Sequence, residues 1–234
     1  MRLSIDDGKE KKNLGEAFQA ETVTFKDLNF QQKKSYIWDY YKWHILSVIG
    51  VILLAIVIVP QIIDNMKPTK LYLTMVNCEW AHDEGSLLLD EYAKAYDINT
   101  EEYKFTADTS TVIVRDSVDK FSVESAQKLV ALIANNTIDV FVSDMANHTV
   151  YSDSGTFFNL SEVLDAEFIE QYKERLVYTT DSETGSEIPT GIYVEDLDKF
   201  EGAYLKEAVL GIILNSENLE AAKDFIYFVF NYNI

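Results

Sequence analysis

The sequence predicts an α/β fold in which one membrane-spanning helix precedes a layered domain with a mostly parallel sheet. Two observations predict it. Residues 44–63 form an apolar stretch without Lys, Arg, Asp or Glu. In residues 71–234, short apolar runs alternate with segments whose apolar residues recur every three or four positions. An alternation of strands and helices is typical of a parallel sheet covered by helices.

The apolar stretch, HILSVIGVILLAIVIVPQII, matches a hydrocarbon core about 30 Å thick at about 1.5 Å per residue. A buried core helix fits less well, because soluble helices of this length carry a polar stripe. A cleaved signal peptide also fits less well, because its apolar run is about 7–15 residues long. We expect an anchor in contact with membrane lipid. Its first boundary is rich in aromatic residues: Tyr36, Trp38, Tyr40, Tyr41 and Trp43.

The lysines around this stretch predict its orientation. Four precede it (Lys26, Lys33, Lys34, Lys42) and two follow it (Lys67, Lys70). This bias predicts a single-pass protein of the cell membrane with a cytoplasmic N-terminus and an extracellular C-terminal domain. The predicted parts are a tail with a juxtamembrane interfacial segment (1–43), the span (44–63), a linker (64–70) and the domain (71–234). The segment 25–43 is also compatible with a helix that docks on another membrane protein.

The net charge of -19 is unevenly placed. Residues 1–43 carry 8 basic and 7 acidic side chains, whereas residues 64–234 carry 12 basic and 32 acidic ones. Such an imbalance excludes a nucleic-acid binder that works through a general basic surface. An acidic surface keeps an exported domain soluble. The one cysteine, Cys78, cannot form an internal disulfide.

In the first half of the domain, residues 71–76 predict a buried strand. A helix capped by Ser86 follows, with one apolar face made by Leu89, Tyr92, Ala93 and Tyr96. Residues 102–106 predict a second strand. Residues 111–115 predict either a further strand or an extended connection.

In the second half, Ser122 is predicted to cap a helix whose apolar stripe is Val123, Ala126, Val130, Ile133 and Ala134. A strand at 139–143 ends in Asp144. Short helices are predicted at 157–164 and 166–176, and a loop at 180–191. Residues 208–214 predict a strand covered on both faces. Ser216 is predicted to cap the last helix, with its apolar side at Leu219, Ala222, Ile226, Val229 and Phe230.

Three of these segments resemble a known family. SAQKLVALIANNTIDVFVSD (125–144), FFNLSEVL (157–164) and EAVLGIILNSENLEAAKDFIYFVF (207–230) are similar to type 2 periplasmic-binding-protein-like domains. The leader SYIWDYYKWHIL (35–46) resembles leaders of small membrane-anchored proteins of this kind in Gram-positive bacteria. The resemblance implies a membrane-tethered, non-enzymatic binding module with a reduced second lobe. An alternative is a ligand-free interaction or regulatory subunit of a transporter-type membrane complex.

Motifs of catalysis and metal binding are missing from the sequence. His44 lies at the membrane edge, so only His82 and His148 remain as bases, and no G-x-S-x-G turn accompanies them. HExxH, CxxC and GxGxxG are absent, so we expect no enzyme, no cofactor and no metal site. The acidic loop 181–187 offers oxygen ligands without the spacing of a calcium loop. A solvated loop is the preferred interpretation, and cation binding there stays open.

Ligands of open α/β sheets bind beyond the carboxyl ends of the strands. This rule selects Asn77, Glu79 and Trp80 after the first strand, Asp144 after the strand 139–143, and Tyr193 after the Gly191 turn. Trp80 offers a flat surface for a sugar or another small molecule, and Asp144 accepts hydrogen bonds. Each has a structural alternative, because Trp80 can cover the core and Asp144 can cap the next helix.

Overall fold

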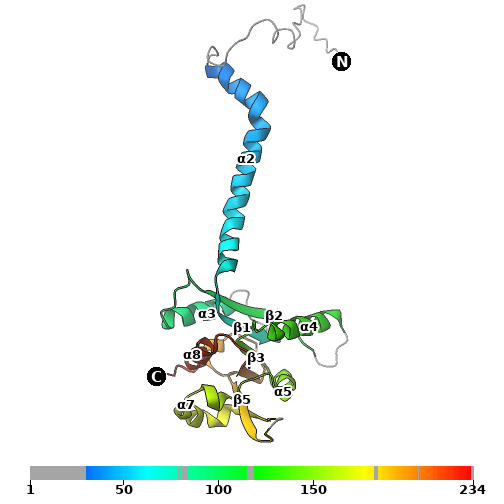
Figure 1. Cartoon of the computed structure of the whole chain (residues 1–234), viewed down its shortest axis with the longest axis vertical. Coiled ribbons are helices and arrows are strands. Elements are labelled where there is room, and N and C mark those ends of the chain that lie inside the picture. Colours follow the sequence, from blue (N-terminus) through cyan, green and yellow to red (C-terminus); the bar gives the residue numbers. More distant parts are fainter. Residues whose placement is uncertain are drawn as a thin grey trace, which may run out of the picture. The chain divides into compact units, whose positions relative to one another are not determined.

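The computed structural model describes residues 30–78, 80, 84–114, 119–181, 184–204 and 206–232. The chain separates into two compact units, Met1–Ile63 and Asp64–Ile234. The described part of the first unit is helical, and the second unit contains a sheet with helices on both faces (Figure 1). The chain is therefore an α/β protein with one long N-terminal helix.

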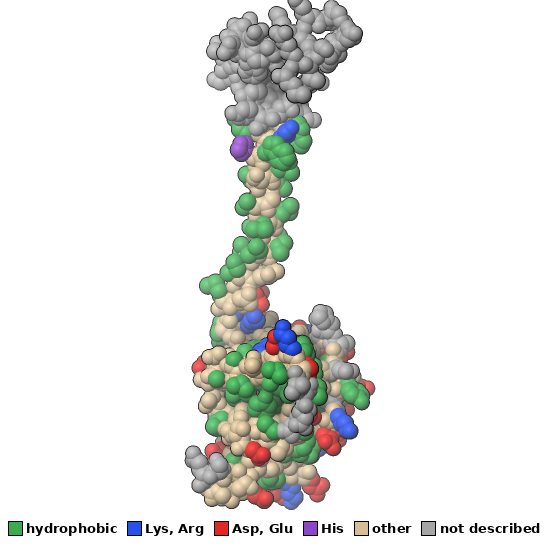
Figure 2. All heavy atoms as spheres, turned by 90° about the vertical axis from the view of Figure 1, so that its right-hand side faces the viewer, with side chains coloured by type: hydrophobic (Ala, Val, Ile, Leu, Met, Phe, Trp, Pro, Cys, Tyr) green, Lys and Arg blue, Asp and Glu red, His purple; other side chains and the backbone are tan. Residues whose placement is uncertain are grey.

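Helix α2 spans Phe30–Met66. Its part Tyr41–Met66, 26 residues, is long and apolar enough to cross a membrane, and its most apolar window has no buried residue. At 1.5 Å per residue this part is about 39 Å long. Hydrophobic side chains cover it (Figure 2). Helix α2 ends at Met66, and only Lys67 and Pro68 separate it from the first strand. Residues 64–66 of the predicted linker are therefore helical.

The sheet has six strands in the order β2-β1-β3-β6-β5-β4. Their bounds are β1 Thr69–Val76, β2 Lys104–Thr111, β3 Val140–Asp144, β4 Leu176–Thr180, β5 Glu187–Tyr193 and β6 Ala208–Ile212. Every residue of β6 is buried. The central position of β6 explains this burial, since a strand covered on both faces has apolar residues in succession.

The sheet is mixed, so the prediction of a mostly parallel sheet is wrong. β1 is parallel to β2 and to β3. β6 runs antiparallel to both of its neighbours, β3 and β5, and β4 is antiparallel to β5. The physical reason is the type of connection. A parallel neighbour requires a crossover helix, whereas β4 and β5 form a hairpin and no α-helix separates β5 from β6.

Helices cover both faces of the sheet. They are α3 Glu84–Ala95, α4 Lys120–Ala134, α5 Met145–Asp153, α6 Leu160–Val163, α7 Ala166–Gln171 and α8 Leu219–Val229. The larger core joins β1, β3 and β6 to α3, α6, α7 and α8, and Tyr92 and Phe225 meet edge to face in it. The smaller core includes Leu129 of α4 and Phe141 of β3. Helices α4 and α5 contribute to the smaller core, whereas α3, α6, α7 and α8 contribute to the larger one.

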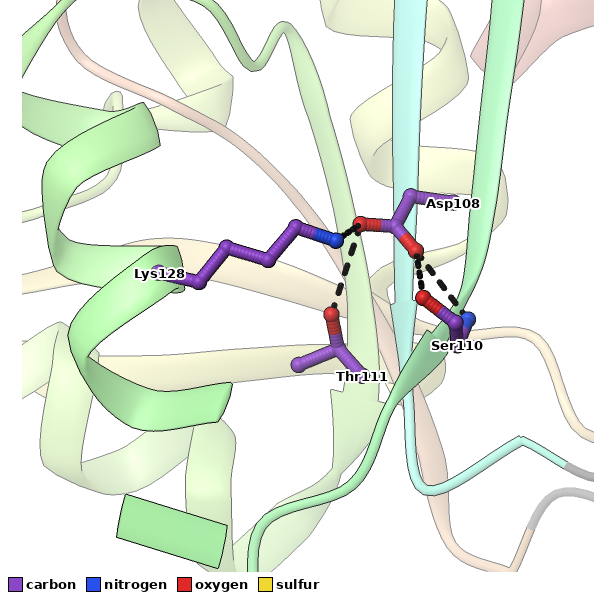
Figure 3. Close-up of polar contacts among 4 residues, drawn as sticks. All are labelled: Asp108, Ser110, Thr111 and Lys128. Carbon is purple, nitrogen blue, oxygen red and sulfur yellow. Dashed lines mark hydrogen bonds and ion pairs between the residues drawn. The ribbon is translucent and has the colours of Figure 1, made fainter. Parts of the chain in front are cut away.

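An ion pair fastens α4 to β2 (Figure 3). The Lys128 ammonium donates to Asp108 Oδ2 at 2.6 Å, and Ser110 donates from its backbone N and its Oγ to Asp108 Oδ1. Burial by itself raises the pKa of the Asp108 carboxyl, but the bonds from Lys128 and Ser110 outweigh it and hold this pKa below its usual value. The Asp108 carboxylate therefore has a structural role, because it links β2 to α4.

All three serines predicted as helix caps have other positions. Ser86 lies inside α3, which includes Glu84. Asp119 caps α4 by accepting from the Ser122 N–H at 2.9 Å. Ser216 precedes the cap residue of α8 and donates to the fully buried carboxylate of Asp139 at 2.7 Å. Serine suits several positions near a helix start, so the sequence alone did not select among them.

The predicted core stripe of α4 is only partly correct, because Ile133 packs against the smaller core but Val123 and Val130 face outward. Val123 is 43% exposed and Val130 is 56% exposed, whereas Ser122, Ser125 and Leu129 are the buried residues of this helix. Small serines permit close packing, and the Ser122 hydroxyl accepts the Val114 N–H at 2.9 Å. An apolar surface is therefore left uncovered on α4.

The predicted loop 180–191 is wrong at its ends, because Thr180 belongs to β4 and residues 187–191 belong to β5. Pro189 lies opposite Tyr178 beside a shift of register, where a missing N–H is tolerated. The turn itself is short, and Gly185 adopts a positive φ of 70° in it. The nearby short helices also differ in extent: α6 begins only at Leu160, and the predicted helix 166–176 is α7 followed by a 3-10 turn.

Candidate functional site

Four of the five predicted site residues lie at one edge of the sheet. The carboxyl ends of β3 and β5 lie there beside the amino end of β6, since Asp144 pairs with Ala208 and Tyr193 pairs with Val209. β1 is parallel to β3, so Asn77 and Trp80 follow it at the same edge. Glu79 lies outside the described residues.

Asn77 and Asp144 are in direct contact and serve the fold. Asn77 Nδ2 donates to Asp144 Oδ2 at 2.7 Å, and Asn77 Oδ1 accepts the Ile113 N–H at 2.8 Å. Asp144 is the N-cap of α5 and accepts from the Asn147 backbone N–H at 2.8 Å. Asn77 has a φ of 57°, which asparagine tolerates better than most residues. This cluster fixes the segment before α4, and its oxygens are occupied.

Tyr193 is half-buried and joins β5 to β6 through its backbone. The described contacts give its hydroxyl no hydrogen bond to Asn77, Trp80 or Asp144. The structure therefore joins Asn77 and Asp144 by a hydrogen bond that does not include Tyr193.

Trp80 lines a surface hollow of about 580 Å³. Its ring centroid lies 6.0 Å from that of Phe200, and its indole nitrogen is buried without a hydrogen-bond partner in the described part of the chain. The other walls come from the start of α3, the segment 198–202 and the end of the chain, with Glu84, Leu87, Leu88, Glu91, Asp198, Lys199, Glu201, Gly202 and Asn231. Trp80 also packs against the larger core, as expected from the alternative that this side chain covers the core.

The hollow is acidic. Four carboxylates (Glu84, Glu91, Asp198, Glu201) and one ammonium (Lys199) line it. Lys199 Nζ lies 2.9 Å from Glu91 Oε2 and 4.4 Å from the centre of the Phe228 ring. One carboxylate and one aromatic ring thus engage this cation. The described side chains that line the hollow carry a net negative charge.

A second hollow, of about 320 Å³, lies elsewhere on the domain and includes Ser152 and Thr190 in its wall. Their hydroxyl oxygens are 2.7 Å apart, and Thr190 Oγ1 is 3.4 Å from Nε2 of the fully buried His148. Burial lowers the pKa of His148 to about 4. His148 is therefore neutral at physiological pH, and the other predicted base, His82, lies outside the described residues.

The chain matches no family model, no curated protein and no solved structure. The resemblance of residues 125–144, 157–164 and 207–230 to type 2 periplasmic-binding-protein-like domains stays a prediction.

Sequence reasoning found Trp80 but missed most of its hollow. The segment 198–202 and Asn231 lie more than a hundred residues from Trp80 in sequence, and no local pattern connects them. Asp198 lines the hollow, whereas Asp196 forms an ion pair with Arg175.

The acidic loop 181–187 is a turn fastened by its own bonds. Asp181 Oδ1 accepts the Thr184 N–H at 2.8 Å, and Glu187 is the first residue of β5. Glu183 lies outside the described residues. Over the described part of the chain, no group of three His, Cys, Asp or Glu side chains is placed to hold a metal ion.

Proposed function

We propose that this chain is a membrane-tethered extracellular binding module, non-enzymatic, with its ligand in the Trp80 hollow. The hollow carries the proposal. It lies at the carboxyl edge of the sheet, has the volume of a small-molecule site and presents an aromatic side chain beside charged groups. Among the described residues, the buried indole N–H of Trp80 has no hydrogen-bond partner.

The tether is part of the same proposal. The apolar part of α2 has the length of a span, and the lysine bias around it favours an N-terminus inside the cell. The resemblance to solute-binding proteins supports a reduced form of that family, in which the second lobe is small. Protease treatment of intact cells tests the orientation, since it should remove residues 71–234 and spare the N-terminal tail.

Ligand binding is tested by thermal unfolding of the full chain in nanodiscs with sugars, amino acids, peptides and divalent cations. A ligand that fills the hollow should raise the unfolding temperature of the wild-type protein by mass action. It should not do so for Trp80→Leu. The control variant Tyr178→Leu removes a half-exposed aromatic ring on β4, outside the hollow, and should keep the response. A complete lack of response in the wild-type protein refutes the proposal.

A second function, as a ligand-free subunit of a membrane complex, is favoured by the uncovered apolar face of α4. Val123, Ala126, Gln127, Val130, Ala131 and Ala134 line it. Apolar surfaces of this kind commonly contact other proteins. Mild detergent extraction should then recover a stoichiometric membrane protein that Val130→Glu releases and Glu187→Lys retains. Recovery of a monomer refutes this second function.

A further inference from the structure

We propose that β4 is the contact strand of a dimer in which two copies of this chain pair antiparallel, edge to edge. The inference does not depend on a ligand, because no residue of β4 lines the Trp80 hollow. Three observations carry it: the open side of β4, its composition, and the charges at its two ends.

β4 is the last strand of the sheet and has a neighbouring strand on one side only. Within the described residues, the backbone of residues 177–180 forms hydrogen bonds with no segment other than β5. Tyr178 is 50% exposed and Thr180 is exposed, as expected for a strand that is open to solvent. The N–H and C=O groups along such an edge are matched by another extended strand.

The composition of β4 favours pairing with another strand. Its sequence, LVYTT, consists of β-branched and aromatic residues and one leucine, without a charge, a glycine or a proline. A second copy of the same strand can therefore pair with it without burying a charge.

The opposite edge of the sheet differs from β4. Sheet edges that stay unpaired commonly carry charged residues or bulges. β2 has both: it contains Lys104 and Asp108, and it has two residues between the partners of Thr74 and Val76, where β1 has one. β4 is continuous, because the additional residue at its shift of register is Thr190 of β5. The protection seen at one edge is thus missing at the other.

The charges at the two ends of β4 select the antiparallel direction. Lys173 and Arg175 precede the strand, each in an ion pair with a carboxylate, whereas Asp181 and Glu187 lie at its other end. An antiparallel copy brings the cations of one chain to the acidic end of the other, but a parallel copy brings the two acidic ends together. With Tyr178 on the two-fold axis, Arg175 of one copy is opposite Asp181 of the other. The strand and its flanks are therefore complementary to themselves, as an isologous interface requires.

A cysteine on the proposed axis tests the contact. Cys78, the one cysteine of the sequence, is replaced by Ala in the full chain, which is reconstituted in liposomes of zwitterionic lipid. A short bismaleimide then links copies through Tyr178→Cys or, as the control, through a cysteine in place of Tyr204, which is 73% exposed and outside the six strands. We expect at least about fivefold more covalent dimer from Tyr178→Cys, because opposite Cβ atoms of paired strands lie about 5 Å apart. Equal linking at both positions, or none at Tyr178→Cys, overturns the proposal.

A charge on the axis should separate the copies. Tyr178→Lys brings two ammonium groups face to face in the dimer, and the half-exposed position accepts this side chain in a single copy. Sedimentation of the full chain in detergent should show a dimer dissociation constant at least about tenfold higher than that of the wild-type protein. The control Tyr204→Lys makes the same change in charge and should leave the constant unchanged. Thermal unfolding near the wild-type temperature verifies that each variant folds. A wild-type monomer, or equal effects of the two lysines, contradicts the β4 contact.

Two neighbouring positions test the direction. In the antiparallel pair Val177 of one copy is opposite Thr179 of the other, whereas in an in-register parallel pair each position is opposite itself. Copies with Val177→Cys and copies with Thr179→Cys carry tags of different length and are reconstituted together. We expect the mixed dimer to exceed its share under random pairing. An excess of self-linked dimers would show parallel pairing and overturn the antiparallel assignment. If no cysteine of β4 links two copies, the second copy is wrong as the occupant of this edge.

Discussion

Acid should destabilise the domain through His148. This side chain is fully buried, its ring is stacked at 4.4 Å on Phe157, and its Nε2 lies 3.4 Å from Thr190 Oγ1. Burial lowers its pKa from 6.5 to about 4. Below pH 6.5 the unfolded chain binds a proton that the folded chain does not, so stability present at neutral pH is lost as the pH falls toward 4. Between pH 7 and pH 5 this loss is about 2 kcal/mol.

The assay is urea unfolding of residues 64–234 at pH 7, 6 and 5, followed by circular dichroism. His148→Gln removes the titrating group and keeps a polar side chain near Thr190. The loss of unfolding free energy between pH 7 and pH 5 should be about 2 kcal/mol smaller in this variant than in the wild-type protein. The carboxyls of Asp139 and Asp224 have raised pKa values, mainly through burial, but they are present in both proteins and cancel in the difference. Parallel pH profiles of the two proteins would refute the reasoning.

Two further substitutions test the packing. Gly191→Ala should destabilise the domain by about 1–3 kcal/mol in urea, because the new Cβ would lie 2.5 Å from Val209 Cγ1 and 2.7 Å from His148 Nε2; unchanged stability would contradict this close approach. Asp108→Asn should cost about 1–2 kcal/mol by the same measurement, since it removes the ion pair with the half-exposed Lys128. Lys128→Met should cost more, because it leaves the buried carboxylate without its cation, and an equal cost would contradict that asymmetry.

The elements that the sequence predicted well are those set by local physics. Strands 71–76, 139–143 and 208–214 are short apolar runs, and each coincides closely with a buried strand of the structure. A run of buried apolar residues identifies a strand whatever its neighbours are. The direction of a strand depends on its connection, and the segment between β5 and β6 carries no periodic pattern that would have indicated an antiparallel return.

The error on α4 has a different cause. Periodicity identified the helix but assigned its faces by hydrophobicity alone, whereas the sheet side of α4 has the small side chains of Ser122 and Ser125. Their polar groups are satisfied by local bonds, such as that between the Ser122 hydroxyl and the Val114 N–H. A buried serine with a partner costs little, so Val123 and Val130 can remain exposed while serines face the sheet.

The same limit applies to the candidate site. The edge rule located Asn77, Trp80 and Asp144 correctly at one end of the sheet, but position alone does not separate a ligand group from a structural one. The hydrogen bonds separate them. Asp144 and Asn77 are saturated by Asn147 and Ile113, so a ligand would have to displace bonds that hold α5 and the segment before α4. Trp80 lines the acidic hollow, and no hydrogen bond within the described residues engages its indole N–H. Binding is therefore expected to depend on Trp80, while substitution of Asp144 should act on folding.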